Sequence, residues 1–251
     1  MRYALKVSYD GTHFGGWQLQ NNTRTVQEVL ETAAQKVFGS SVKMRGSGRT
    51  DAGVHAEAQV CHFDADTTIP AHKIASCMNL YLPPDVRVLE SAAAEGFDAT
   101  EGKKKTYRYT FYYASCELPL VSRYAYRLRV KPDFEKMQAA ANLYVGEHDF
   151  KAFCAAGSSA KTSVREILGI NLVKTEFENR EQFDFFVTGK GFLYNMVRIM
   201  AGELIEVGCG KECVIEQAFE TGRRDTLGKT APAKGLTLVS VEYENSPFTV
   251  K

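Results

Sequence analysis

The chain has 251 residues, of which 44% are hydrophobic and 24% are charged, with 31 basic against 30 acidic side chains. This length and composition suffice for a hydrophobic core in one large or two small domains, and they exclude an intrinsically disordered chain. The net charge of +1 excludes a uniformly basic nucleic-acid-binding protein. The sequence shows neither a secretory apolar segment nor a run of about 18 apolar residues, so we expect a cytoplasmic protein without a membrane span.

The six cysteines are scattered along the chain, at positions 61, 77, 116, 154, 209 and 213. No Cys-x-x-Cys pair occurs, and this spacing is typical of reduced, partly buried thiols in a cytosolic protein. Cys209 and Cys213 would supply two metal ligands, but no histidine pair completes the tetrahedral set that zinc requires. We therefore predict no metal site.

The first hundred residues alternate between strand and helix patterns. Hydrophobic alternation predicts strands at 2–9, 42–44, 58–64 and 85–91, and apolar residues on one helical face predict helices at 25–38 and 70–82. Thr25 and Glu28 form a capping box at the start of the first helix, and Gly39 ends it. Pro83 and Pro84 end the second helix.

A second set of elements follows in the rest of the chain. The pattern predicts strands at 105–113, 166–174, 182–188 and 236–243, and helices at 133–144, 196–207 and 213–220. Runs of strands with two helices per half predict two α+β units. We place these units at residues 1–103 and 104–251, although no Gly/Ser linker marks the boundary.

The segment from Gly46 to Ala56 reads GSGRTDAGVHA and is the most informative part of the chain. Its glycines permit left-handed turns and the close approach of a ligand, so a turn here can hold Asp51 out in a groove. The neighbouring Arg49 favours an ionised carboxylate, which can act as a nucleophile, a base or a metal ligand. The same residues also suit a polar turn in which Arg49 and Asp51 pair structurally.

The string GRTDAGVHA resembles the signature of the tRNA pseudouridine synthase A family. Further matches follow in order: YDG at 9–11, GWQ at 16–18, TVQE at 25–28, KTYRY at 105–109, GEHDF at 146–150, FLYNMVR at 192–198, APA at 231–233 and GL at 235–236. The resemblance covers almost the whole chain. An ordered set of this length is specific, whereas RTDAG alone would not be.

This resemblance implies the pseudouridine synthase fold, in which two RRM-like, sandwich-like α+β halves join their antiparallel sheets into one, with the active-site cleft between them. It also implies isomerisation of uridine to pseudouridine in the anticodon stem-loop of tRNA, at positions 38 to 40, by a homodimer. The reaction breaks the C1′–N1 bond, turns the base and rejoins it through C5. It needs no redox cofactor and no metal, but the uridine must leave its stack.

The resemblance further implies which residues act. Asp51 matches the family's catalytic aspartate, which attacks, stabilises or deprotonates the sugar at C1′. Tyr107 matches the active-site tyrosine, whose ring can stack on the base and whose hydroxyl can move a proton, although a sheet-face aromatic packing a helix is the alternative. Arg198 matches an arginine that pairs with Asp51. We expect Arg49 to contact the RNA backbone or help flip the base, and Leu236 to support the base or pack in the core.

Basic residues gather in one stretch of the chain. Between residues 103 and 131 there is one acid, Glu117, and eight basic residues: Lys103, Lys104, Lys105, Arg108, Arg123, Arg127, Arg129 and Lys131. Interleaved aromatics favour RNA binding over a merely solvated strand pair. Contacts of this kind with phosphates position RNA and make its affinity depend on salt.

The sequence departs from the family pattern ahead of the Tyr107 strand. The family usually has Phe-His-Ala-Arg-Phe there, whereas this chain reads FDATEG at 97–102, with Thr100 in place of the arginine. The spacing to Tyr107 is about one residue short. An RNA contact is therefore either missing or supplied by the lysines at 103–105.

Other activities fit the sequence less well. His55 and Glu57 form a His-x-Glu pair, but the Pro-Cys-x-x-Cys string of zinc deaminases is absent. A glycosidase needs two cooperating carboxylates, and only Asp51 lies in the loop. The remaining alternatives are a non-catalytic RNA-binding or chaperone protein that presents aromatics on a sheet, and a pseudouridine synthase that acts on another RNA.

Overall fold

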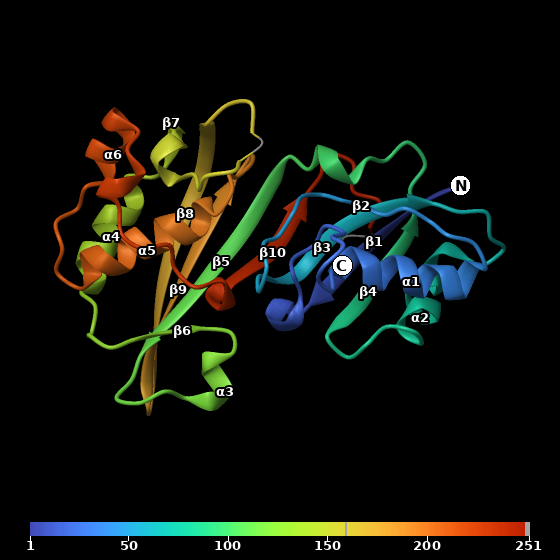
Figure 1. The fold of residues 1–251 in the computed structure, drawn as a ribbon, viewed down its shortest axis with the longest axis horizontal. Coiled ribbons are helices and arrows are strands. Elements are labelled where there is room, and N and C mark those ends of the chain that lie inside the picture. The colour runs from blue at the N-terminus through green and yellow to red at the C-terminus, as the bar shows by residue number, and fades with distance from the viewer. Residues whose placement is uncertain (159, 249–251) are drawn as a thin grey trace. The chain divides into compact units, whose positions relative to one another are not determined.

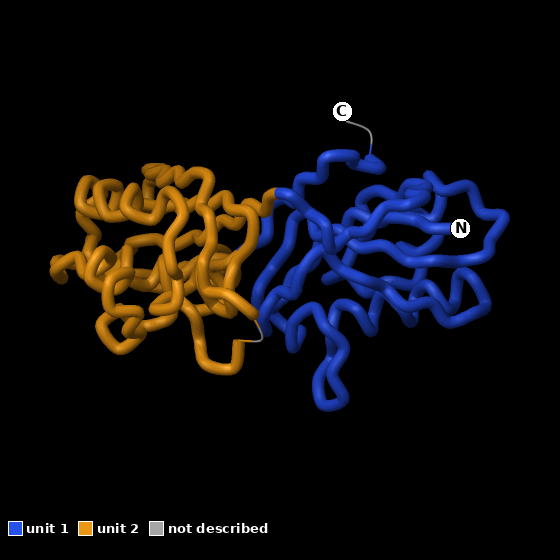
Figure 2. Tube along the Cα trace, turned by 90° about the horizontal axis from the view of Figure 1, so that it is seen from above, with its two compact units in different colours: residues 1–103, 237–251 blue, residues 104–236 orange. Residues whose placement is uncertain are grey.

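The computed structural model describes residues 1–158 and 160–248, which form two compact units. Unit 1 comprises residues 1–103 and 237–251, and unit 2 comprises residues 104–236 (Figure 2). The C-terminal segment from residue 237, which the sequence analysis assigned to the second half, therefore groups with the first. The reason is the pairing of Thr237 and Leu238 with His55 and Ala56 of unit 1.

The sheet of unit 1 has β3 (His55–Asp64) near its centre. Its other strands are β1 (Arg2–Tyr9), β2 (Arg45–Gly46), β4 (Val86–Ala93) and β10 (Leu236–Glu242). β1 pairs antiparallel with both β3 and β4, β2 pairs antiparallel with β3, and β10 pairs with β3 in parallel. β3 starts three residues earlier than predicted because its first residues have a partner in β10. The strand predicted at 42–44 is absent, and β2 follows that segment instead.

Two helices pack on one face of this sheet, α1 (Val26–Phe38) and α2 (Ile74–Asn79) (Figure 1). The predicted capping box of α1 is confirmed, with Thr25 and Glu28 each bonding the other's backbone N–H, and Gly39 ends the helix in the left-handed region. α2 is shorter than predicted. Its last residue, Asn79, turns its side chain to the backbone of Val88 in β4, with hydrogen bonds of 2.8 and 2.9 Å.

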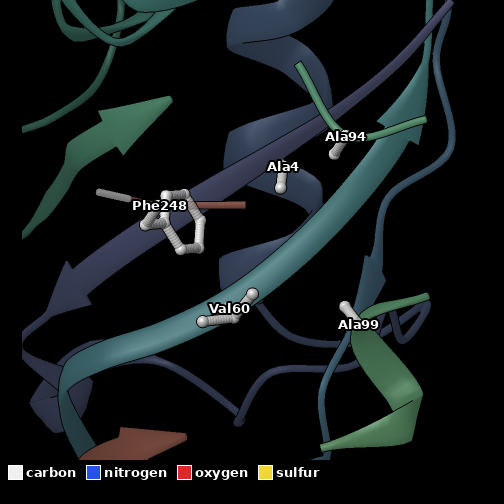
Figure 3. Close-up of a cluster of buried hydrophobic side chains, with 5 residues drawn as sticks. All are labelled: Ala4, Val60, Ala94, Ala99 and Phe248. Atoms are coloured by element: carbon white, nitrogen blue, oxygen red, sulfur yellow. The ribbon is translucent and has the colours of Figure 1, made fainter. Parts of the chain in front are cut away.

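The opposite face of the unit 1 sheet is covered by the C-terminal segment and by a 3-10 turn at Ala99–Glu101. Phe248 lies on Ala4 of β1 and Val60 of β3, and Ala94 and Ala99 complete this small core (Figure 3). Lys6 places its ammonium 4.7 Å from the centre of the Phe248 ring. Both faces of the sheet are therefore buried over its central strands.

The sheet of unit 2 runs in the order β5, β9, β8, β7, with all three pairings antiparallel. The bounds of these strands are Lys104–Tyr113, Arg180–Gly189, Val164–Phe177 and Gly146–Asp149 respectively, and β6 (Tyr126–Leu128) pairs with β5 in parallel. α+β architecture is thus confirmed in each unit, with two short parallel pairings in otherwise antiparallel sheets. The joining of the two sheets and the cleft between them stay predictions.

The helices of unit 2 include α3 (Pro119–Ser122), α4 (Phe134–Asn142), α5 (Met196–Gly208) and α6 (Ile215–Thr221). Phe134 of α4 stacks on Phe183 of β9, which stacks in turn on Phe111 of β5. α5 extends through Gly208, one residue beyond the predicted end. Gly202 of α5 lies directly against the backbone of Lys229, so that a Cβ on Gly202 would meet the Lys229 carbonyl oxygen at 1.9 Å.

Replacing Gly202 by Ala should destabilise unit 2. The methyl group would push the 229–231 segment away from α5, a strain that typically costs about 1–3 kcal/mol and outweighs the gain of about 1 kcal/mol in helix propensity. We expect the melting temperature to fall by several degrees in a thermal melt followed by circular dichroism. Gly169→Ala in β8, where a Cβ meets nothing within 4 Å, is the matched control. Equal melting temperatures for the two variants would contradict this view of the α5 contact.

Candidate active site

Asp51 lies in a turn of unit 1 that leads directly into β3. The Val54 amide donates to the Asp51 carbonyl at 3.1 Å, and Gly53 has a φ of +77°. The turn is held from both sides by the segment that follows β1. The Trp17 amide donates to the Thr50 carbonyl at 3.1 Å, and the Gly53 amide donates to the Phe14 carbonyl at 3.2 Å. These bonds fix the backbone on each side of the carboxylate.

Buried side chains also hold the Asp51 turn in place. The Tyr9 hydroxyl hydrogen-bonds the Thr50 hydroxyl at 2.8 Å, and Ser47 donates to Gln59, which in turn donates to the Gly48 carbonyl. Burial raises the pKa of the Tyr9 phenol well above its usual range, so this hydroxyl keeps its proton. The motif at residues 9–11 and the Asp51 turn, separate in the sequence, are thus parts of one structure.

Gly16 and Trp17 act as a close-fitting support for the turn. Gly16 has a φ of +105°, and a Cβ on it would meet the Thr50 carbonyl oxygen at 2.6 Å. Trp17 is only 3% exposed, and its ring packs against Gly46 and Tyr9. Trp17 is therefore both a core residue and a support of the Asp51 turn.

The two charged residues of the turn differ in exposure. Asp51 is half-buried, whereas Arg49 is exposed. Within residues 1–158 and 160–248, Arg49 forms no ion pair. Arg49 therefore does not pair with Asp51. This excludes the structural alternative that the sequence left open for the turn. The guanidinium remains available to a ligand.

His55 begins β3 and is buried. Its Nδ1 accepts a hydrogen bond from the Gly11 amide at 3.0 Å, and the Asp10 carboxylate lies 3.2 Å from the same nitrogen. His55 therefore links the segment at residues 10–11 to the start of β3.

Tyr107 and Arg198 lie in unit 2. Tyr107 is on β5 and meets the ring of Phe192 edge to face, with the centroids 5.1 Å apart. Arg198 is in the first turn of α5, where Nε donates to the Ala231 carbonyl at 2.8 Å and Nη1 donates to the Asn195 side chain at 2.6 Å. The expected ion pair of Arg198 with Asp51 would join residues of different units and stays a prediction.

The segment at 231–236 is fastened to unit 2 by these same groups. The Ala231 amide donates to the Arg198 carbonyl at 3.1 Å, and the buried Tyr109 donates its hydroxyl proton to the Pro232 carbonyl at 2.8 Å. Gly235 allows Tyr109 this approach, since a Cβ there would meet the ring at 2.7 Å. Leu236, the next residue, is 6% exposed and precedes Thr237, which pairs with His55. The supporting roles of Asn195, Tyr109 and the Ala231 carbonyl could not be predicted from the sequence, although all three residues lie within the matched motifs.

The basic stretch is only partly available for phosphate. Arg127 donates to the carbonyls of Ala114 and Ser115, Lys131 pairs with Glu181, and Arg108 lies 3.8 Å from Asp184. Lys103 pairs with Glu244 of the C-terminal segment at 3.4 Å, with both side chains exposed. Arg123 lies over the ring of Tyr124. The roles of Lys103, Lys104, Lys105, Arg108, Arg123 and Arg127 in RNA binding stay predictions.

The segment that departs from the family pattern is firmly packed. Asp98 caps the 3-10 turn at Ala99–Glu101, and the Ala99 carbonyl accepts from the Tyr243 hydroxyl at 2.7 Å. Phe97 packs edge to face on Tyr243 at 4.8 Å. The Lys103 amide donates to the Glu242 carbonyl at 2.8 Å. The shortened segment therefore fits onto the end of β10.

The described residues, 1–158 and 160–248, contain no group of three or more His, Cys, Asp or Glu side chains that could hold a metal ion. Cys209 and Cys213 are both exposed. Among the helices in the same ranges, none has the length and apolar character needed to cross a membrane.

Comparison with known proteins gives a consistent result. The family model described as tRNA pseudouridine synthase matches residues 6–100 and 140–244. The proteins named tRNA pseudouridine synthase A from Acetivibrio thermocellus and Ruminiclostridium cellulolyticum are 43% and 42% identical over 243 and 246 residues, which cover 95% and 96% of this chain and 98% and 99% of theirs. The protein of that name from Limosilactobacillus fermentum is 41% identical over 251 residues, covering 97% of this chain and 96% of its own.

The matched regions include the Asp51 turn, its support at residues 9–18, and α5 with the 231–236 segment. Identity above 40% over nearly the full length of several relatives, together with the family model, places the chain without ambiguity: it belongs to the tRNA pseudouridine synthase family.

Proposed function

We propose that this protein isomerises uridine to pseudouridine in the anticodon stem-loop of tRNA, at positions 38 to 40, with Asp51 acting at C1′ of a flipped uridine. The observation that carries the proposal is the geometry of the Asp51 turn. Its backbone is bonded on both sides, while Asp51 itself is half-buried and Arg49 is exposed. A carboxylate that is fixed but accessible suits attack on, or stabilisation of, a sugar carbon.

The chemistry balances without an oxidant or a group carrier. The C1′–N1 bond breaks, the detached base rotates until C5 faces C1′, and C5 then bonds to C1′. The C5 hydrogen leaves as a proton, and N1 gains one. Asp51 either forms an ester at C1′ that C5 of the base later displaces, or takes a proton from the sugar carbon next to C1′ as the base leaves and returns it when C5 bonds to C1′. In both routes the carboxylate must stay beside C1′ throughout, and the support of the turn suits that requirement.

Tyr107 and Arg198 complete the proposed site. The Tyr107 ring offers a face to the detached base, and its hydroxyl can move the proton lost from C5. Arg198 is oriented by Asn195 and the Ala231 carbonyl, and its guanidinium balances the charge of Asp51 once the site is closed to water. Leu236 supports the base through apolar contact. Arg49 contacts the RNA backbone and favours the flipped uridine.

tRNA is the substrate named for the relatives of this chain. The exposed Arg49 and the basic stretch at 103–131 provide cations for its phosphates. A homodimer that holds one tRNA is part of the proposal. We place the protein in the cytoplasm, where tRNA is processed.

Asp51→Asn should abolish turnover and leave tRNA binding intact. The amide keeps the size of the side chain but removes the negative charge needed at C1′, so we expect a loss of at least about a thousandfold. Tritium release from transcripts labelled with [5-³H]uridine measures the reaction directly, because C5 loses its hydrogen. Asp66→Asn, at an exposed carboxylate of the same unit, is the control. Tight binding with no release by either the parent or the control would favour a non-catalytic RNA-binding protein or a different RNA substrate.

Tyr107→Phe and Tyr107→Leu should separate the two roles of the tyrosine. Phe keeps the ring and removes the hydroxyl, so the release rate at saturating tRNA should fall about 10²–10⁴-fold if the hydroxyl moves a proton. Leu removes the ring as well and should weaken the reaction further. Tyr113→Phe, on the same strand, should behave as the parent protein. If Tyr107→Phe reacted at the parental rate, the hydroxyl would have no part in proton transfer, and Tyr107 would contribute to catalysis through its ring alone.

Gly16→Ala should reduce activity more than stability. A Cβ at a φ of +105° that also meets the Thr50 carbonyl at 2.6 Å must displace the Asp51 turn, and a shift of about 1 Å can cost roughly a hundredfold in rate. Gly39→Ala is matched in strain, with a φ of +73°, but a Cβ there meets nothing within 4 Å. It should lose about 1 kcal/mol of stability and retain its activity. If both variants kept the parental rate in the tritium assay, the support of the turn would not matter for catalysis.

A further inference from the structure

A hollow at one end of the unit 1 sheet is lined by polar and charged side chains. A hollow of about 250 Å³ is lined there by Arg2, Lys43, Arg45, His62, Phe63 and Asp64. Arg2 lies opposite Asp64 in the β1–β3 register, and Arg45 lies opposite His62 in the β2–β3 register. Directly opposed residues share a face of a sheet, as do His62 and Asp64, two residues apart. Polar groups from three strands thus meet on one face.

The charges of this hollow do not balance. Arg2 grips the Asp64 carboxylate with two hydrogen bonds of 2.9 and 3.0 Å and donates to the Phe97 carbonyl, so this pair is internally satisfied. Lys43 and Arg45 are both exposed, and within residues 1–158 and 160–248 neither forms an ion pair or a side-chain hydrogen bond. Two positive charges therefore remain uncompensated at the hollow.

His62 also lines the hollow. It is 3% exposed, and its Nδ1 accepts from the Ala99 amide at 3.0 Å, which leaves the proton of the neutral ring on Nε2. Burial lowers the pKa of His62, and the neighbouring Arg2 and Arg45 lower it further, while Asp98 at 3.8 Å and Asp64 oppose this shift. The ring is consequently a fixed N–H donor rather than a third cation.

We propose that this hollow binds a phosphate group of the RNA backbone, through Lys43, Arg45 and the Nε2–H of His62. Two unpaired cations beside a fixed N–H donor form the donor set that phosphate oxygens accept. The site belongs wholly to unit 1 and lies outside the basic stretch at 103–131. The proposal rests on the proposed function, since it takes the RNA substrate as the source of the phosphate.

The test removes the two unpaired cations together. In Lys43→Ala/Arg45→Ala, the dissociation constant of a tRNA transcript should rise about tenfold at 0.1 M salt, and the slope of log K against log [salt] should fall in magnitude by roughly 0.7–0.9, the value for one lost phosphate contact. The rate of tritium release at saturating tRNA should equal that of the parent, because neither residue belongs to the Asp51 site. Filter binding over a series of salt concentrations provides the dissociation constant and the slope.

Lys36→Ala/Lys73→Ala is the matched control, because it removes two exposed lysines from the same unit and changes the net charge equally. A rise in dissociation constant and a fall in slope of equal size in both double variants would show a general charge effect and overturn the proposal. Parental affinity and slope in Lys43→Ala/Arg45→Ala would do the same.

A second measurement distinguishes RNA from a free anion. Inorganic phosphate is titrated into ¹⁵N-labelled protein while the ring nitrogens of His62 are observed. A shift that is lost in Lys43→Ala/Arg45→Ala, together with the weakened tRNA binding, supports the proposal. The same shift with unchanged tRNA binding would assign the hollow to a small free anion and overturn it. If tritium release fails in the parent protein while the tRNA effect persists, the proposed reaction is wrong and the phosphate site stands.

Discussion

Two hydrogen bonds between backbone groups, from Trp17 to Thr50 and from Gly53 to Phe14, hold the turn on which the rest of the proposed chemistry depends. A carboxylate that must stay at one sugar carbon while the base leaves, turns and returns cannot be carried by a free loop, since a shift of about 1 Å is costly in rate. Side-chain contacts alone would leave the backbone dihedrals of the turn adjustable. Bonds on both sides of Asp51 remove that freedom, and the positive φ of Gly16 lets the supporting segment come close enough to make one of them.

Unit 2 uses the same kind of support around Arg198. Long cationic side chains lose much conformational entropy when they are ordered, so a guanidinium is held best where fixed acceptors already surround it. Here those acceptors are the Ala231 carbonyl and the Asn195 side chain, and the Ala231 amide returns a bond to the Arg198 backbone. The helix that carries the arginine and the segment that precedes β10 therefore position each other. The segments at 192–198 and 231–236 are therefore parts of one structure within unit 2.

Local signals in the sequence predicted what local interactions decide. The capping box at Thr25 and the strand at residues 2–9 need only neighbours in sequence, and both are confirmed. Predictions failed where a distant partner decides. β3 starts at His55 because Thr237 pairs with it. The membership of residues 237–251 in unit 1 has the same origin. The family resemblance predicts Asp51 as the catalytic residue, and the structure shows that residues 14–17 hold the backbone on either side of it.

The distribution of charge shows the limit of counting along a sequence. The run of cations at 103–131 stands out, yet Lys131 and Arg127 are committed to Glu181 and to backbone carbonyls. Lys43 and Arg45 attract no attention in the sequence, because the residues that make them significant lie across the sheet in β3. A cation's availability for phosphate depends on whether the fold has already supplied it with an acceptor, since a cation must neutralise a phosphate to release the counterions condensed on the RNA. By that criterion an isolated pair of exposed, unpaired cations can matter as much to RNA binding as a denser run of which several members are already paired.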